Sequence, residues 1–444
     1  MKDHPVNRGG LFQILTRYVS LTVLSLITCH LSLFSCSSRN PNLSEKQLLE
    51  LANDTMPTVS EKEDLRADTG KYIPSGVQYR EKRGIDPARP PVTIDVIRNR
   101  NNRSRLKLSD IASSLRTIRI KYPEGNSVRL QLHITGNRIY ASSMNGLYDY
   151  SENGGLPVTI VKNETDKGTW GIGFFGTFDV WKNLMMYNYF ERENDELKVN
   201  ELLICAAEGH HKNNVIPLSK TIRAKFINDH SIIDARSFTG LSLRGDTLCR
   251  FTDYEAGNGI TNPESSALYR INGELTLRKA YNDTVFRVTA PNRWVPAYVV
   301  SFGEYRATSE ESRKGSDMAG KLIPRSWYET PAHIYMTYCE GRDYPNRRNR
   351  EKVPFWGCIY NKATRMLVHQ EHNEHTYVPL SFENDLDPDG IPFWIQGVTE
   401  DGELYMTVTK EDIRERIASG QYPETAQKLY DSMPENEQLI VIAK

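Results

Sequence analysis

The segment DTVFRVTAPNRWVPAYVV, residues 283–300, contains the pattern that determines the fold class. An apolar run that carries an aromatic residue is followed by a polar turn and then by a second short apolar run. Runs of this kind, rich in β-branched and aromatic residues and bounded by turn formers, are typical of paired β-strands. The same pattern occurs in GLYDYSENGGLPVTIV (146–161), ALYRINGELTLRKA (267–280) and CIYNKATRMLVHQ (358–370).

The remainder of the chain from residue 92 onward has the same pattern of short apolar runs bounded by turn formers, with about twenty strand-length runs in all. Clear helical signals occur only near the end, in KEDIRERIASG (410–420) and PETAQKLYDSM (423–433). An open sheet of so many strands would curl or split, and sandwiches use fewer strands. We therefore predict an all-β fold for residues 92–444, a β-propeller with six blades or, as the alternative, seven. We expect residues 438–443 to pair with residues 92–97 and so close the ring.

The charge composition gives no reason to expect a nucleic-acid partner. Among 444 residues, 56 lysines and arginines balance 56 aspartates and glutamates. Strongly one-sided charge is what favours binding to nucleic acids or other polyelectrolytes. The partners to expect are therefore proteins, glycans or membranes.

The N-terminal segment has the features of an export signal. A basic leader with Lys2, Arg8 and Arg17 precedes an apolar stretch, residues 18–35, and Cys36 follows directly. This arrangement is typical of a lipoprotein signal peptide that is cleaved before an acylated, for example palmitate-bearing, cysteine. Cys29 is a weaker candidate for the same role, and an uncleaved membrane-spanning helix is the alternative.

The predicted organisation is a signal peptide (1–35), a tether (36–91) and the propeller (92–444). The tether contains several prolines and many charges, and a short helix is expected in LSEKQLLELAN (43–53). The lipid on Cys36 would hold the protein to a membrane in the cell envelope. We expect an outer-membrane lipoprotein that faces the periplasm or the cell surface.

Disulfide bonds are possible outside the cytoplasm. Cys339 and Cys358 lie in two strand-like runs separated by a loop, so they could face each other across a hairpin. Unpaired buried thiols are the alternative, because the sequence contains no CxxC spacing.

The segment FENDLDPDGIPFWIQGV, residues 382–398, is a candidate metal site. Asp385, Asp387 and Asp389 alternate before a glycine, as at the start of a calcium-binding loop. An EF-hand is excluded because its twelfth position would be Gln396, which cannot supply a bidentate carboxylate. Calcium is the one possible cofactor that the sequence suggests, and the alternative is a turn that leads into a strand.

Several segments, taken together and in order, resemble a known family over nearly all of residues 92–444. The chain is similar to lipoproteins of gut-dwelling Gram-negative bacteria that are described as six-bladed β-propellers of unknown function. The matching segments are LSDIASSLRTIRI (108–120), NDTVFRVTAPNRWVPAYVVSFG (282–303), GCIYNKATRML (357–367), ENDLDPDGIPFW (383–394) and PENEQLIVIAK (434–444). The resemblance implies a six-bladed propeller on a lipid tether without an established activity, and it supplies no metal role for the acidic loop.

Two functions follow from these observations. The first is a membrane-tethered propeller that binds a protein or glycan and has no catalytic residues. The second is a calcium-dependent hydrolase or lactonase, in which polar residues within apolar runs, such as Asn188 and Asp234, would reach the propeller channel. The alternative for these two residues is that they satisfy backbone groups between blades. The two functions differ in whether three or more carboxylate or amide side chains from different blades meet at the axis.

Overall fold

The computed structural model describes residues 81–122, 130–136, 138–143, 146–151, 153–162, 169–171, 178–193, 196–207, 213–218, 222–235, 237–251, 267–279, 282–308, 311, 320–340, 355–370, 380–387, 390–418 and 423–444. The predicted signal peptide, Cys36, the short helix near residue 44 and Asp389 lie outside these residues.

Nearly all regular structure in the described residues is β. A first group of strands consists of β5 (Gln131–Thr135), β6 (Arg138–Ser143), β7 (Gly146–Ser151) and β8 (Gly154–Lys162). The next sheet contains β9 (Thr169–Gly171), β10 (Phe178–Trp181), β11 (Leu184–Glu193), β12 (Glu196–Ala206) and β13 (Asn213–Pro217). A four-stranded sheet follows, made of β14 (Ala224–Asn228), β15 (Ser231–Asp234), β16 (Thr239–Ser242) and β17 (Thr247–Arg250).

Three more groups complete the sheets. One contains β18 (Ala267–Ile271), β19 (Glu274–Arg278), β20 (Thr284–Ala290), β21 (Arg293–Ser301), β1 (Lys82–Arg83) and β2 (Val92–Asp95). Another contains β22 (Leu322–Glu329), β23 (His333–Glu340), β24 (Phe355–Asn361), β25 (Leu367–Gln370) and β3 (Arg103–Ser104). The last contains β28 (Gly397–Val398), β29 (Leu404–Thr409), β30 (Glu437–Ala443) and β4 (Leu115–Lys121), and a small sheet pairs β26 (Ser381–Phe382) with β27 (Phe393–Trp394).

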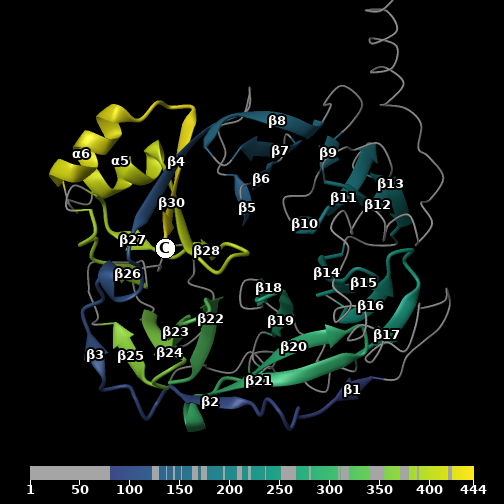
Figure 1. Ribbon diagram of the computed structural model, residues 1–444, viewed down its shortest axis with the longest axis horizontal. Helices are drawn as coiled ribbons and strands as arrows, with labels where there is room; N and C mark the ends of the chain where they lie inside the picture. The colour runs from purple at the N-terminus through teal and green to yellow at the C-terminus, as the bar shows by residue number, and fades with distance from the viewer. Residues whose placement is uncertain are drawn as a thin grey trace, which may run out of the picture.

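The sheets are arranged around a common centre, as in a β-propeller (Figure 1). Strands β5, β10, β14, β18 and β28 lie nearest the centre of the ring (Figure 1). The all-β propeller prediction is therefore confirmed. The number of blades stays a prediction, because β4 and β8 join two four-stranded groups into one eight-stranded sheet through the single pair Ile120–Gly155.

The hydrophobic core is divided into clusters that each lie between two neighbouring groups of strands. Strand β11 shows why, because Leu184 and Met186 pack toward β14 and β15 whereas Met185 and Tyr187 pack toward β6 and β7. Side chains alternate between the two faces of a strand, so an unbroken apolar run indicates burial on both faces. The run LMMY therefore encodes a strand with a neighbouring sheet on each side.

The ring closes through β30 and β4, not through β30 and β2. Strand β30 lies between β29 and β4, and its seven residues pair antiparallel with Leu115–Lys121. Our prediction that residues 438–443 pair with residues 92–97 was wrong. Strand β4 brings Ile118 and Ile120 into the core beside β30, whereas the short strand β2 runs parallel to the edge of β21.

The two predicted C-terminal helices are α5 (Lys410–Ala418) and α6 (Pro423–Ser432), inserted between β29 and β30. Thr409 and Asp412 form a reciprocal cap at the start of α5, with the Thr409 backbone N–H donating to Asp412 at 2.8 Å and the Asp412 N–H donating to the Thr409 hydroxyl at 3.2 Å. Ile413, Ala426 and Met433 bury one side of this helical pair in the core. No helix within the described residues is long and apolar enough to cross a bilayer.

Candidate functional site

Five ionisable side chains meet near the centre of the ring, and we call them the axial cluster. They are His133 on β5, Asp179 on β10, Lys225 on β14, Arg270 on β18 and Glu400 in the turn between β28 and β29. Each comes from a different group of strands, and their four strands are the innermost ones of their groups (Figure 1). The closed ring is what brings these distant positions together.

Asp179 is fully buried and its carboxylate is saturated with donors. Lys225 Nζ donates to Oδ1 at 2.9 Å, and Arg270 donates from Nη1 to Oδ1 at 3.1 Å and from Nη2 to Oδ2 at 2.8 Å. The backbone N–H of Phe226 donates to Oδ2 at 2.8 Å. Burial alone would raise the pKa of Asp179, but Arg270 and Lys225 outweigh it and hold the pKa below its usual value. This aspartate is therefore ionised and fixes both cations.

Glu400 and His133 are held less tightly. Glu400 Oε1 lies 3.4 Å from His133 Nε2 and 3.4 Å from Arg270 Nη1. Burial lowers the pKa of His133 to about 3, with the charge of Lys225 acting in the same direction, so the imidazole is neutral near pH 7. Burial also raises the pKa of Glu400. Within the described residues Nε2 of His133 has no hydrogen-bond partner, whereas Glu400 Oε1 accepts a long hydrogen bond from Arg270.

Aromatic rings border the axial cluster. The ring of Phe178 is edge-on to His133 at 5.8 Å, and Tyr140 lies 6.4 Å from the same imidazole. The guanidinium carbon of Arg270 lies 4.8 Å from the ring of Trp181. A polar cluster with a few aromatic neighbours is typical of a site that recognises a small polar ligand.

The axial cluster also contains the only described group of three side chains able to hold a metal ion. The ligand atoms of His133, Asp179 and Glu400 lie within 4.8 Å of one another. However, both oxygens of Asp179 already accept hydrogen bonds from Arg270, and two cations lie in the same place. Calcium needs six to eight oxygen ligands, and a divalent ion would be repelled by these charges. The residues present therefore fit a metal ion poorly.

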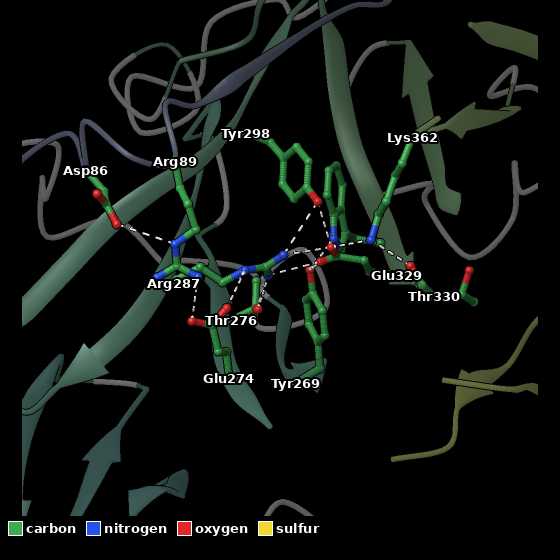
Figure 2. Close-up of polar contacts among 11 residues, drawn as sticks. Asp86, Arg89, Tyr269, Glu274, Thr276, Arg287, Tyr298, Glu329, Thr330 and Lys362 are labelled. Carbon is green, nitrogen blue, oxygen red and sulfur yellow. Dashed lines mark hydrogen bonds and ion pairs between the residues drawn. The ribbon is translucent and has the colours of Figure 1, made fainter. Parts of the chain in front are cut away.

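A second buried polar cluster, the Glu329 network, lies between β18–β21 and β22–β25 (Figure 2). Glu329 is fully buried and accepts from Arg287 at 2.7 and 3.1 Å, from Lys362 at 2.8 Å, from Tyr298 at 2.8 Å and from Tyr269 at 2.5 Å. The Trp327 indole N–H in turn donates to the Tyr269 hydroxyl at 2.6 Å. Because the carboxylate of Glu329 is fully hydrogen-bonded, we interpret this network as a structural contact that holds the two sheets together.

A family model matches the chain over residues 74–419. The family is described as a domain of unknown function, DUF4933. This chain belongs to the DUF4933 family. The match includes every residue of the axial cluster and the Glu329 network. No curated protein matches the DUF4933 chain.

Solved structures from Bacteroides are among the matches to the DUF4933 chain. One is described as a "Putative exported protein" from Bacteroides fragilis, with a TM-score of 0.51 and 13% identity, and the match covers 80% of this chain and 99% of the other. A member of the DUF4221 family from Bacteroides vulgatus has a TM-score of 0.37 and 11% identity, with 75% and 97% of the two chains covered. A protein of unknown function from Bacteroides thetaiotaomicron has a TM-score of 0.37 and 8% identity, with 74% and 76% covered.

The two described aspartates of the acidic loop form turn contacts. The carboxylate of Asp385 accepts from the Ser109 backbone N–H at 2.9 Å and from the Ser109 hydroxyl at 2.5 Å. The Asp387 N–H donates to Asn384 Oδ1 at 3.0 Å, and the Gly390 N–H donates to the Asp387 carbonyl at 2.8 Å. Neither belongs to a described group of three metal-binding side chains. These contacts favour the turn, and a calcium site that includes Asp389 stays a prediction.

Cys339 and Cys358 lie on a hairpin, as expected, but they are not bonded to each other. Strands β23 and β24 pair so that Cys339 is opposite Phe355 and Cys358 is opposite Met336. An offset of three residues places the two side chains on opposite faces of the sheet. Both are free and buried, so the disulfide prediction was wrong and its alternative, unpaired thiols, describes the structure.

We expect the four described cysteines to resist alkylation in the native protein. Cys205, Cys249, Cys339 and Cys358 are all free and buried, and burial raises the pKa of each thiol and so suppresses the reactive thiolate. Iodoacetamide labelling without a reductant, followed by peptide mass spectrometry, should give little modification at the four positions before urea is added and full modification afterwards. Cys339 and Cys358 that stay unlabelled in urea would instead reveal a disulfide.

Asn188 and Asp234 satisfy backbone groups. Asn188 Nδ2 donates to the Ile222 carbonyl at 2.8 Å, and Asp234 accepts from the backbone N–H groups of Arg223 at 3.0 Å and Ser237 at 3.1 Å. Both lie on second strands, β11 and β15, and so do not reach the axis. The axial cluster was not predicted from the sequence, although His133, Asp179, Lys225 and Arg270 are likewise single polar residues within apolar runs, on first strands and not on second ones.

Proposed function

We propose that this DUF4933 protein is a lipid-anchored extracytoplasmic protein whose propeller binds a ligand at the axial cluster, and that the ligand is a glycan. The observation that carries the proposal is the axial cluster itself, in which hydrogen-bond donors and acceptors from five groups of strands converge beside aromatic rings. A protein ligand on the outer loops is the other class that the sequence suggested. The axial cluster favours the glycan because its polar atoms are few, close together and largely buried.

The calcium-dependent hydrolase or lactonase has less support. It requires several oxygen ligands that are free to bind the ion, and the axial cluster offers two carboxylates, one of which is saturated by Lys225 and Arg270. The fold by itself does not decide between these functions, because one fold supports many activities. The proposal therefore depends on the chemistry of the five side chains.

The anchoring part of the proposal rests on the basic leader, the apolar stretch and Cys36. The description of the Bacteroides fragilis neighbour as exported agrees with it. Within this proposal the lipid on Cys36 holds the propeller at the outer membrane, facing the periplasm or the cell surface. The tether predicted within residues 36–91 then connects the lipid to the ring.

Replacing Cys36 with alanine is expected to release the protein from the membrane. The full chain would be expressed in a Gram-negative host and followed by membrane fractionation and by metabolic labelling with a palmitate analogue. We expect wild type to be labelled and in the membrane fraction, and the Cys36→Ala variant to be unlabelled and to lose membrane retention at least tenfold. The matched control, Cys29→Ala, should behave as wild type. Unchanged retention and labelling of Cys36→Ala would contradict the lipid anchor at this position.

A further inference from the structure

Two buried nitrogen atoms of the axial cluster have no hydrogen-bond partner within the described part of the chain. They are Nε of Arg270 and Nε2 of His133. The side chain of Arg270 is only 5% exposed. Buried polar atoms are nearly always hydrogen-bonded, so an unpartnered pair at one place needs an explanation. Both residues also adjoin Glu400 Oε1, each at 3.4 Å, which is long for a hydrogen bond.

The formal charges of the axial cluster cancel when Glu400 is ionised. Lys225 and Arg270 are positive, Asp179 and Glu400 supply two carboxylates, and the imidazole of His133 is neutral. A bound cation or anion would leave an unbalanced charge in a partly buried place, which is costly. A ligand without charge avoids this cost.

The exposed fraction of the side chain differs among the five residues of the axial cluster. Asp179 is 0% exposed, Arg270 5%, His133 14%, Lys225 26% and Glu400 27%. Lys225 and Glu400 are therefore the side chains of the cluster that are most accessible to a ligand, and His133 and Arg270 are more buried. An ammonium and a carboxylate in one cluster together offer donors and acceptors, which is the combination that adjacent hydroxyl groups can satisfy. The half-buried rings of Phe178 and Trp181 add apolar area for the carbon face of such a ligand.

We propose that the axial cluster binds an uncharged, polyhydroxylated ligand, a neutral saccharide, whose hydroxyl groups bond to Lys225 and Glu400 and reach the free nitrogen atoms of Arg270 and His133. The inference rests on the proposed function and deepens it by naming the class of glycan. Each of these four groups contributes hydrogen-bonding capacity that a hydroxyl can meet, since a hydroxyl both donates and accepts. Asp179 positions the two cations and does not touch the ligand.

The test uses the full chain, purified from membranes in a polyoxyethylene detergent because a maltoside detergent would itself present a sugar. It would be applied to a glycan array that carries neutral oligosaccharides together with uronate-containing, sialylated and sulfated ones. The strongest neutral binder would then be titrated by calorimetry against wild type, Lys225→Met and Glu400→Gln. The control is Lys321→Met, because Lys321 has a similar exposure of 30% and also pairs with a glutamate, Glu311, away from the axial cluster.

We expect neutral oligosaccharides to bind, and Lys225→Met and Glu400→Gln each to raise Kd about tenfold or more, as loss of a hydrogen bond to a charged group does. Lys321→Met should leave Kd unchanged. Thermal unfolding of each variant checks that it is folded, and His133→Phe, which keeps the ring but removes Nε2, provides a second variant if one does not fold. Absence of neutral binders, a preference for acidic glycans, or unchanged affinity of the folded variants would overturn this inference. The Cys36→Ala experiment would still decide the anchor independently.

Discussion

Replacing Glu329 with glutamine is expected to lower the free energy of unfolding by about 3–5 kcal/mol, because removing one partner of a buried ion pair leaves uncompensated charge. Arg287 and Lys362 both donate to Glu329, and their side chains are only 12% and 21% exposed. The amide keeps the shape of the carboxylate, so the loss reports charge and hydrogen bonding and not a cavity. Urea unfolding followed by tryptophan fluorescence would measure it.

The control for this variant is Glu274→Gln. Glu274 also pairs with arginines, with Arg89 at 2.8 Å and with Arg287 at 3.8 Å, but its side chain is 36% exposed. Exposed pairs contribute about 0–1 kcal/mol, so this variant should be nearly as stable as wild type. Equal effects of the two substitutions would contradict the view that the Glu329 network holds the two sheets together (Figure 2).

The same network has a defined pH dependence. Burial alone would raise the pKa of Glu329, but the hydrogen bond and charge of Arg287, with the charge of Lys362, lower it to about 2 from the usual 4.5. At Glu329 the unfolded chain then binds a proton more readily than the folded one. The contribution of the ionised Glu329 to the free energy of unfolding is therefore complete above about pH 4.5 and is lost as the pH falls toward 2. Glu329→Gln should lack this component of acid destabilisation.

The fold class could be predicted from the sequence because it depends on local features. Runs such as LMMY in β11 record burial on both faces, and the two helices were evident from the segments KEDIRERIASG and PETAQKLYDSM. The pairing of β30 with β4, which closes the ring, could not be predicted in the same way. Many edges have similar strand patterns, and the choice of β4 as the partner of β30 depends on which side chains complete the core between distant segments.

The axial cluster was missed for a related reason. Sequence reasoning selected Asn188 and Asp234 as polar residues in apolar runs, but it could not tell a first strand of a group from a second. On a first strand such a residue reaches the centre of the ring, as Asp179 and Arg270 do, whereas on a second strand it satisfies a neighbouring backbone. Strand order within each repeat, and not residue type, was the information that the sequence lacked.

Replacing Gly154 with alanine is expected to destabilise the protein by about 3 kcal/mol. The substitution combines backbone strain with a steric clash at the place where β8 meets β4. Gly154 has φ of +75°, and a Cβ there would lie 2.1 Å from the backbone oxygen of Arg119 on β4. The adjacent Ile120–Gly155 pair is the β-ladder pair between β4 and β8 in the described residues. The backbones cannot keep this approach with a methyl group between them, so β4 must move away from β8.

The neighbouring glycine supplies the control for this prediction. Gly155 has φ of +87° but nothing within 4 Å of a built Cβ, so Gly155→Ala carries the strain without the clash and should cost about 1–2 kcal/mol. The difference between the two variants in urea unfolding therefore isolates the close approach of β4 and β8. If the ring depends on this joint, Gly154→Ala should also speed hydrogen exchange in β4 and β30, which share seven residue pairs, more than in β15 and β16. Equal losses in the two variants, with unchanged exchange in β4, would show that the first and last groups of strands are held together by their shared core and not by this backbone contact.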